Sequence, residues 1–335
     1  MSDPLTPGAM VVSLDFELHW GMRDHSPATG PVTAELVTSR AMVTELASMF
    51  VERSVRATWA TVGFLFASRR DELDLFRPEL RPRYERTELD PYLETVGRDE
   101  DDDPVHLAGS LVRHLALSPG QEVASHTFSH FYCLEAGQDE AAWRADLAAA
   151  RAIAAAGGIE VTSLVLPRNQ WNPRYAAATR ECGFTCYRGP QPSLGHRPGG
   201  SPTTLAARRA ARLADTYVGL RPPPTTSWAE VAEADGLCNV PASAFLRPYS
   251  PARRVLEPVR LARLVAGLRD AARRGRIFHL WWHPHNFAAL PQPNLDLLAR
   301  LLDEFDRLSA SDGLRSLSMR DVADVAVSPE RGPDA

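Results

Sequence analysis

The sequence predicts an α/β fold in which seven or eight parallel strands form a closed or partly closed barrel. Short apolar runs alternate with helical patterns along most of the chain, as in strands joined by right-handed helical crossovers. The 335 residues and this number of strands favour a barrel over an open sheet. No glycine-rich phosphate fingerprint follows the first apolar run, which counts against a dinucleotide-binding fold.

The expected strands are short runs rich in apolar and β-branched residues. In chain order they are residues 10–16, 56–62, 121–125, 162–166, 184–187, 237–242, 277–282 and 314–317. Helical spacing predicts helices over 32–53, 105–117, 139–156, 172–182, 258–274 and 295–308, with a helical turn over 320–327. We expect a single domain over 8–325, with insertions near 69–104 and 191–228, a helix near 205–214 in the second insertion, and a disordered tail over 326–335.

Composition limits the partners and the location. The formal net charge of -5 provides no footprint for nucleic acid or an anionic membrane. No apolar run approaches the ~20 residues of a membrane span, and residues 1–9 lack the basic start and apolar core of a signal peptide. The four cysteines are expected to be buried thiols in a reducing compartment. We therefore expect a cytoplasmic protein; the sequence does not indicate its oligomeric state.

Chemically active side chains fall at or just beyond the carboxyl ends of the expected strands, where the active sites of parallel barrels lie. These residues are Asp15, Glu17, His126, His130, Arg168, His283 and His285. By itself the pair of histidines four residues apart fits an exposed polar turn better than a metal site. One carboxylate with two histidines, however, is typical of a hydrolytic metal centre. Zinc is the first choice, and the same ligands would also bind Co²⁺, Ni²⁺ or Mn²⁺.

These strand ends resemble the motifs of the polysaccharide deacetylases, carbohydrate esterase family 4, which have the NodB-homology domain. The sequence Ser-His-Thr-Phe-Ser-His at 125–130 matches the S-H-x-x-S-H motif of that family in full. Asp15-Phe16-Glu17 resembles the D-x-[DE] variant of its acidic pair. The resemblance covers most of residues 10–320 and implies a distorted (β/α) barrel in a divergent, cytoplasmic member.

The resemblance also implies a role for each residue. Asp15 would be the general base, and Glu17, His126 and His130 would hold the metal. Arg168 would keep Asp15 ionised, because a nearby opposite charge lowers the pKa of a carboxyl group. His283 would be the general acid that protonates the departing amine nitrogen.

Two motifs depart from the family pattern. The arginine element reads Pro167-Arg168-Asn169-Gln170 instead of Arg-x-Pro-aromatic, and the Asp–Trp element that orients the acid histidine has no clear match. The late strand carries two histidines, and we prefer His283 over His285 as the acid because Pro284 ends the strand directly after it. His279 is expected to be a hydrogen-bonded core residue. The expected substrate contacts are Trp20, Trp171, Trp281 and His285.

Three functions remain open. The first is removal of an N-acetyl or related N-acyl group from a sugar or glycan precursor; the absence of a signal peptide favours a nucleotide-linked, lipid-linked or natural-product sugar over cell-wall polymer. The second is hydrolysis of another non-peptide C–N bond, in a cyclic amide or ureide, as in allantoinase-like proteins. For that reaction Arg188 and Arg247 are candidates for holding an anionic substrate. The third is a catalytically inactive glycan-binding module.

Overall fold

The computed structural model describes residues 7–27, 29–190, 224–231 and 236–327. The helix expected near 205–214 and most of the expected insertion at 191–228 lie outside these residues. The expected tail begins inside a helix that ends at Val327, and the rest of it is likewise outside the described part of the chain.

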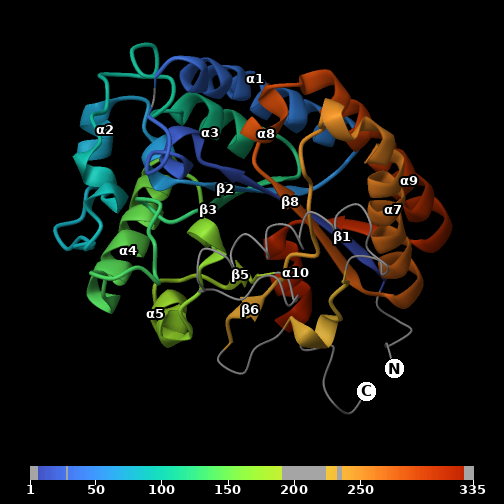
Figure 1. The fold of residues 1–335 in the computed structure, drawn as a ribbon. Coiled ribbons are helices and arrows are strands. Elements are labelled where there is room, and N and C mark those ends of the chain that lie inside the picture. The colour runs from blue at the N-terminus through green and yellow to red at the C-terminus, as the bar shows by residue number, and fades with distance from the viewer. Residues whose placement is uncertain (1–6, 28, 191–223, 232–235, 328–335) are drawn as a thin grey trace.

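A parallel sheet forms the centre of the molecule, and helices cover it from outside (Figure 1). The strand order is β6-β5-β4-β3-β2-β1-β8-β7, with β9 also paired to β1, and every pair is parallel. The strands are β1 Ala9–Phe16, β2 Ala57–Thr61, β3 Gln121–Ser125, β4 Ser163–Val165, β5 Cys186–Arg188, β6 Cys238–Asn239, β7 Ala244–Phe245, β8 Ile277–Trp282 and β9 Arg315–Leu317. Within the described residues no ladder joins β6 to β7, so the barrel is distorted and open there. The predicted fold class is confirmed.

One expected strand is wrong in its extent. The run 237–242 forms β6 over two residues only, and the sequence did not predict β7, which follows it. Pro241 lies between the two strands and has no N–H to donate to a ladder, which explains why the longer strand does not form.

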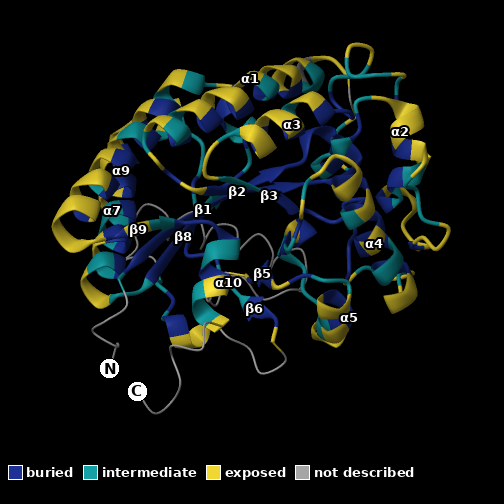
Figure 2. Ribbon diagram, turned by 180° about the vertical axis from the view of Figure 1, so that it is seen from behind, coloured by how far each residue is buried: buried dark blue, intermediate teal, exposed yellow. Residues whose placement is uncertain are grey.

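The helices lie outside the sheet, and most of them turn a buried face toward it and an exposed face toward solvent (Figure 2). The α-helices are α1 Pro31–Glu52, α2 Arg70–Asp74, α3 Gly109–Leu117, α4 Glu140–Ala156, α5 Ala176–Glu181, α7 Glu257–Arg274, α8 His285–Ala288, α9 Pro291–Asp312 and α10 Met319–Val327. Short 3-10 helices are η1 Leu18–Gly21, η2 Gly63–Phe66, η3 Thr87–Leu89, η4 Pro91–Leu93, η5 Pro167–Asn169, η6 Pro173–Tyr175, η8 Trp228–Glu230 and η9 Pro251–Leu256. No helix in the described part of the chain is long and apolar enough to cross a membrane.

Strand β1 is the central strand and is buried along its whole length. Successive side chains of a strand face opposite sides of the sheet. One set packs in the core between the sheet and the outer helices: Met10, Val12, Leu14 and Phe16. Ala9 and Val11 face the other way and pack inside the barrel with Val165, Val240 and Ile277. Ser13 and Asp15 continue this second set, so β1 points the Asp15 carboxylate into the mouth of the barrel.

Candidate metal centre and active site

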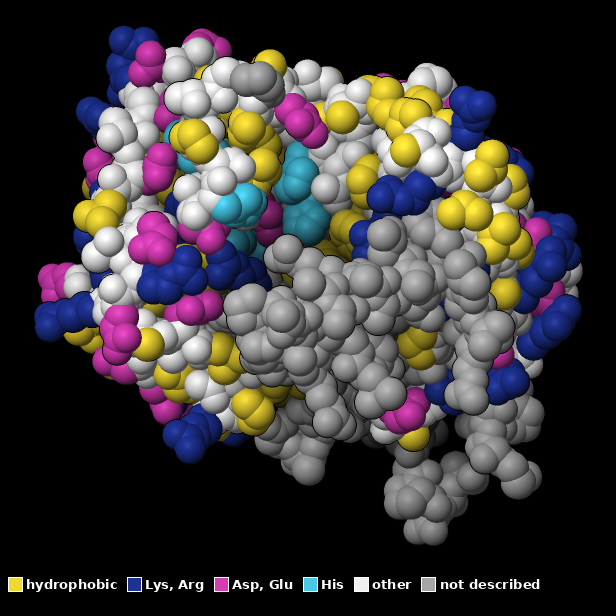
Figure 3. Space-filling model, viewed as in Figure 1, with side chains coloured by type: hydrophobic (Ala, Val, Ile, Leu, Met, Phe, Trp, Pro, Cys, Tyr) yellow, Lys and Arg dark blue, Asp and Glu magenta, His cyan; other side chains and the backbone are white. Residues whose placement is uncertain are grey.

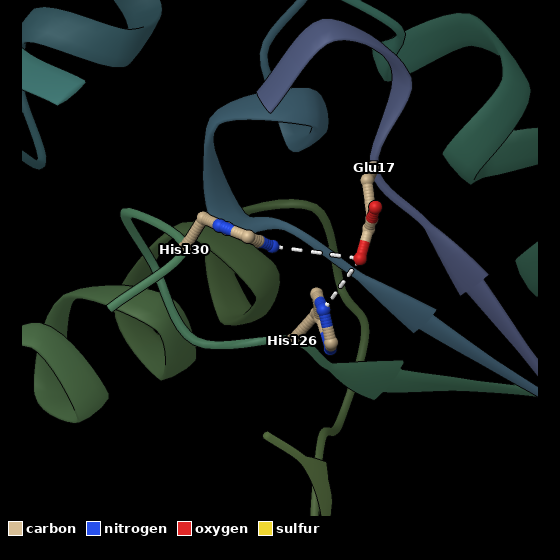
Figure 4. Close-up of side chains that lie close together, drawn as sticks. All are labelled: Glu17, His126 and His130. Atoms are coloured by element: carbon tan, nitrogen blue, oxygen red, sulfur yellow. Dashed lines mark hydrogen bonds and ion pairs between the residues drawn. The ribbon is translucent and has the colours of Figure 1, made fainter. Parts of the chain in front are cut away.

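Glu17, His126 and His130 lie together at the carboxyl end of the sheet (Figure 4). Glu17 directly follows β1, His126 directly follows β3, and His130 lies in the loop after it. The Oε1 atom of Glu17 is 2.9 Å from Nε2 of His126 and 3.4 Å from Nε2 of His130. All three side chains are buried. The structure therefore brings together the three metal ligands expected from the sequence.

The two histidines lie in a tight loop. Thr127 and His130 have φ angles of 63° and 57°, in the left-handed region that non-glycine residues rarely adopt. Asp146 of α4 fixes this loop by hydrogen bonds. Its carboxylate accepts hydrogen bonds from the backbone N–H of Phe128 (2.7 Å), the backbone N–H of Ser129 (3.1 Å) and the Ser129 hydroxyl. Strained backbone of this kind persists only where the surroundings fix it.

The ligand set fits a divalent metal. Burial, which outweighs the attraction of Glu17, lowers the pKa of His130 to about 4, so this imidazole is neutral as metal binding requires. Burial opposes ionisation of Glu17, but the surrounding histidines hold its pKa well below the usual value. Nε2 of His130 is buried and has no hydrogen-bond partner in the described part of the chain, since its contact with Glu17 is poorly directed. A cation would satisfy this lone pair.

Asp15 pairs with Arg188, and the expected pairing with Arg168 is wrong. The Arg188 guanidinium donates two parallel hydrogen bonds to the Asp15 carboxylate, from Nη1 to Oδ1 (2.6 Å) and from Nη2 to Oδ2 (2.7 Å). Both side chains are buried. Burial acts to raise the pKa of Asp15, but Arg188 outweighs it and the pKa is lowered. Asp15 is therefore ionised, and its partner is the last residue of β5.

The physical reason is the place of each arginine. Arg188 ends a buried strand, so its side chain crosses the barrel interior toward β1. Arg168 lies in η5 with a φ of 55°, and its guanidinium pairs with Asp24 and covers the ring of Tyr132 at 4.4 Å. The sequence does place Arg188 directly after the expected strand 184–187, and this position was a signal that it could face the barrel interior. The earlier assignment of Arg188 to an anionic substrate also fails, because both of its terminal nitrogens bond Asp15.

His279 is a hydrogen-bonded core residue, as expected. Its Nδ1 lies 3.1 Å from the carbonyl oxygen of Val240 and its Nε2 lies 2.8 Å from the hydroxyl of Ser13. Since a carbonyl oxygen only accepts, Nδ1 carries the proton and Ser13 donates to Nε2. Burial lowers the pKa of His279 to about 3, so the ring is neutral.

His283 stands over the two carboxylates. Its Nε2 is 3.6 Å from Oε1 of Glu17 and 3.8 Å from Oδ2 of Asp15. Burial favours the neutral ring, but the charges of Glu17 and Asp15 outweigh it and raise the pKa of His283 to about 9. The Oδ1 atom of Asn286 lies 3.3 Å from Nδ1 of His283 and accepts a hydrogen bond from its N–H. Asn286, which sequence reasoning missed, thus occupies the orienting position that the absent Asp–Trp element left open.

His285 begins α8, and its ring centroid is 4.9 Å from that of His283. Burial, followed by the nearby charge of His283, lowers the pKa of His285 to about 4. The two neighbouring histidines therefore differ in charge at neutral pH: His283 is protonated, and His285 is neutral.

The expected aromatic contacts divide into two groups. Trp20 is fully buried, donates its Nε1–H to the carbonyl oxygen of His106 (3.0 Å) and packs on Phe64, so its expected substrate role is wrong. The turn of η1 folds this side chain back into the core. Trp171 and Trp281 are half-buried; Trp171 stacks on Tyr187 and Trp281 lies under Arg188. Figure 3 shows histidine side chains gathered in a hollow of this face, with an acidic side chain among them.

Solved structures share this fold. Two proteins assigned as polysaccharide deacetylases superpose on it: one from Mycobacterium smegmatis (TM-score 0.59, 16% identity, 97% of this chain and 95% of that one) and one from Pseudomonas aeruginosa PAO1 (TM-score 0.54, 14% identity, 94% and 89%). Puue allantoinase superposes with a TM-score of 0.55 at 13% identity, over 98% of this chain and 96% of that one. No protein-family model and no curated protein sequence matches this chain. The fold is therefore that of the NodB-type polysaccharide deacetylases.

Proposed function

We propose that the protein is a metal-dependent hydrolase that removes an N-acetyl or related N-acyl group from a sugar or glycan precursor. One observation carries this proposal: the cluster of Glu17, His126 and His130 lies directly beside an ionised carboxylate and a cationic imidazole. His283 is within 4 Å of both Glu17 (3.6 Å) and Asp15 (3.8 Å). A base, an acid and a metal-binding set at one point are the parts that amide hydrolysis needs.

Glu17, His126 and His130 would hold the metal, with zinc as the first choice and Co²⁺, Ni²⁺ or Mn²⁺ bound by the same donors. When bound, such an ion polarises an amide carbonyl and acidifies the attacking water. Asp15 accepts a proton from that water, and Arg188 keeps Asp15 in the ionised form that can do so.

His283 donates its Nε2 proton to the amide nitrogen as the C–N bond breaks, which yields a carboxylic acid and an amine. In the metal-free protein the charges of Glu17 and Asp15 raise the pKa of His283 to about 9, so the ring is protonated at neutral pH. Asn286 accepts from Nδ1 and so fixes the ring with Nε2 toward the carboxylates. The half-buried rings of Trp171 and Trp281, together with His285, are the proposed walls for a sugar or acyl group.

A cytoplasmic location is part of the proposal. Cys133, Cys182 and Cys186 form no disulfide, which fits a reducing compartment. The substrate would accordingly be a small molecule or a glycan precursor, such as a nucleotide-linked, lipid-linked or natural-product sugar.

The test is acetate release. Zinc is added to the purified protein to fill the centre of Glu17, His126 and His130. The protein is then incubated with N-acetylated sugars of the nucleotide-linked, lipid-linked and natural-product kinds. We expect acetate from at least one of them, no acetate after His126→Ala because metal is lost, and no acetate after Asp15→Asn although metal is retained. Absence of acetate across the whole panel would exclude this class of substrate.

A second candidate is hydrolysis of a cyclic amide or ureide, and the shared fold with Puue allantoinase favours including it. The same base, acid and metal-binding set would serve. Arg247 remains a candidate for holding an anionic substrate, whereas Arg188 is committed to Asp15. Ureides belong in the same assay, with ring opening as the readout. The third function, an inactive glycan-binding module, requires turnover of none of these compounds while a glycan still binds.

A further inference from the structure

A second group of metal-ligating side chains lies outside the proposed active site. It consists of His19 in η1, Glu94 after η4 and His106 before α3, whose ligand atoms are all within 4.8 Å of one another. Nδ1 of His19 is 2.8 Å from Nε2 of His106, and Nε2 of His106 is 3.9 Å from Oε1 of Glu94. Both histidines are buried, with 1% and 4% of their surface exposed. The first centre has the same composition and similar spacings, 2.9 and 3.4 Å.

The hydrogen bonds of the outer ring nitrogens fix both tautomers. Nε2 of His19 is 2.8 Å from the carbonyl oxygen of Ser26, which only accepts, so Nε2 must carry the proton. Nδ1 of His106 is 2.9 Å from both oxygens of Asp103. The Asp103 carboxylate also accepts a hydrogen bond from the backbone N–H of Gly97 (2.8 Å), so it acts as an acceptor toward both Gly97 and His106. Nδ1 of His106 therefore carries the proton of that ring.

As a result, two unprotonated nitrogens face each other. In the neutral rings, Nδ1 of His19 and Nε2 of His106 each present a lone pair across 2.8 Å, and among the described residues no other group donates a hydrogen bond to either nitrogen. This arrangement is repulsive unless a positive charge shares it. The charge is either an extra proton, which makes one ring an imidazolium, or a metal cation.

We infer that His19, Glu94 and His106 form a second divalent-metal site, for which zinc is the probe of choice. Three features favour a metal over a proton. Glu94 supplies a carboxylate on a third side. Asp103 bonds the far side of the His106 ring, so a metal at Nε2 of His106 would complete the carboxylate–histidine–metal arrangement that orients metal-binding imidazoles. The Glu94 side chain is 32% exposed, which leaves an approach for the ion and for a water as fourth ligand.

The geometry needs a small adjustment. Two nitrogens that each lie about 2.0 Å from a tetrahedral zinc are roughly 3.3 Å apart, so the rings would have to open by about 0.5 Å. Arg23 is the opposing feature, because its charge acts against a cation near His19. Its guanidinium donates to the carbonyl oxygen of Leu89.

The expected role of this site is structural. It would join the turn after β1 to the segment 94–106, which leads into α3. Glu17 is the residue that begins this turn, and the backbone N–H of Trp20 bonds the carbonyl oxygen of Glu17 (3.1 Å). A metal at His19 would therefore stabilise the backbone that presents Glu17. This inference does not depend on the proposed hydrolase activity.

The test removes the first centre and counts metal at the second. In a His126→Ala/His130→Ala background, we expect one zinc per chain by elemental analysis after gel filtration, and a melting temperature that rises with added zinc. Adding Glu94→Gln or His106→Gln should abolish both effects. Adding His114→Gln, an exposed histidine on α3, should change neither. Glu94→Gln alters a partly exposed side chain, so it gives an answer even if the His106 variant does not fold.

The outcomes separate the two proposals. If the double variant binds no zinc, the inference is wrong and the histidine pair shares a proton, whatever the first centre does. If zinc remains bound after Glu94→Gln and after His106→Gln, it binds somewhere other than His19, Glu94 and His106, and the inference is again wrong. If the double variant binds one zinc but the wild type binds no more than that, the second site stands and the proposed hydrolase centre fails.

Discussion

Asp15 shows how much of the chemistry depends on a single neighbour. A carboxylate this deeply buried would be protonated without compensation. The Arg188 fork supplies that compensation with two hydrogen bonds of 2.6 and 2.7 Å. Motif comparison directed attention to Arg168, because an arginine after the fourth strand was expected. Which arginine faces the barrel interior depends on strand register and length, and the sequence alone does not supply these.

Replacing Arg188 should therefore be far more damaging than replacing Arg168. Arg188→Met leaves an unpaired buried carboxylate, which should cost about 3–5 kcal/mol of unfolding free energy and lower kcat by about 100-fold or more. Arg168→Met removes a pair whose arginine is 35% exposed, and Asp24 keeps its contact with His25, so this variant should lose much less stability. Chemical unfolding and acetate release measure the two effects. Equal losses in the two variants would contradict the assignment of Arg188.

The acid can be identified by comparing the two neighbouring histidines. His283→Gln removes the only proton donor expected at this point and should reduce kcat by about 10²–10⁴-fold. His285→Gln removes a neutral ring at the edge and should act mainly on KM. Steady-state kinetics on the best substrate separate kcat from KM. A greater kcat loss in the His285 variant would assign the acid to His285.

At the scale of elements, the loop after β3 and the turns after β1 and β4 carry the strain. Of the six described non-glycine residues with positive φ angles, five lie in these connections: Leu18, Thr127, His130, Arg168 and Asn169. The sixth, Ser54, lies between α1 and β2. The sequence pattern placed both histidines correctly after a strand, but it did not predict the shape of the loop. It could not show that Asp146, sixteen residues after His130, would hold the loop by its backbone N–H groups.

Asp146→Asn should destabilise the protein by about 1–3 kcal/mol. The amide NH₂ would replace a carboxylate oxygen and face N–H groups of Phe128 and Ser129, which are themselves donors. Burial raises the pKa of Asp146 to about 6 from 3.8, so the folded state binds this proton more tightly than the unfolded state. The stabilisation from Asp146 is thus complete below pH ~4 and is lost as the pH rises through ~6.

The difference in unfolding free energy between wild type and Asp146→Asn should consequently be larger at pH 4 than at pH 7, by up to about 3 kcal/mol. Urea unfolding at several pH values measures it, and subtracting the variant removes contributions from other groups. A difference that does not change between pH 4 and pH 7 would show that burial does not raise the pKa of Asp146.

For the whole molecule, the sequence predicted the fold class and the convergence of Asp15, Glu17, His126, His130 and His283, because parallel strand ends meet on one face. It failed where a side chain's direction depends on a short turn. Trp20 lies three residues after Glu17 and was expected to contact the substrate, yet η1 turns it into the core. Asn286 and Asp146 carry no motif, and only packing reveals them.

Metal should stabilise the whole molecule, because the ligands come from β1 and from the loop after β3 and meet only in the folded state. Removing metal with a chelator should lower the melting temperature, and adding zinc should restore it. The gain should be about 3 kcal/mol when free zinc exceeds the dissociation constant roughly 100-fold. Calorimetry with and without zinc tests this. An unchanged melting temperature in wild type would exclude a folded-state metal site.

The most direct test of the central claim is bound zinc and acetate release measured on the same samples of wild type and Asp15→Asn. We expect both proteins to hold zinc at Glu17, His126 and His130, and wild type alone to release acetate from an N-acetylated sugar. A variant that turns over as fast as the wild type would contradict the role of Asp15, and a wild type that binds no zinc would contradict the metal centre itself.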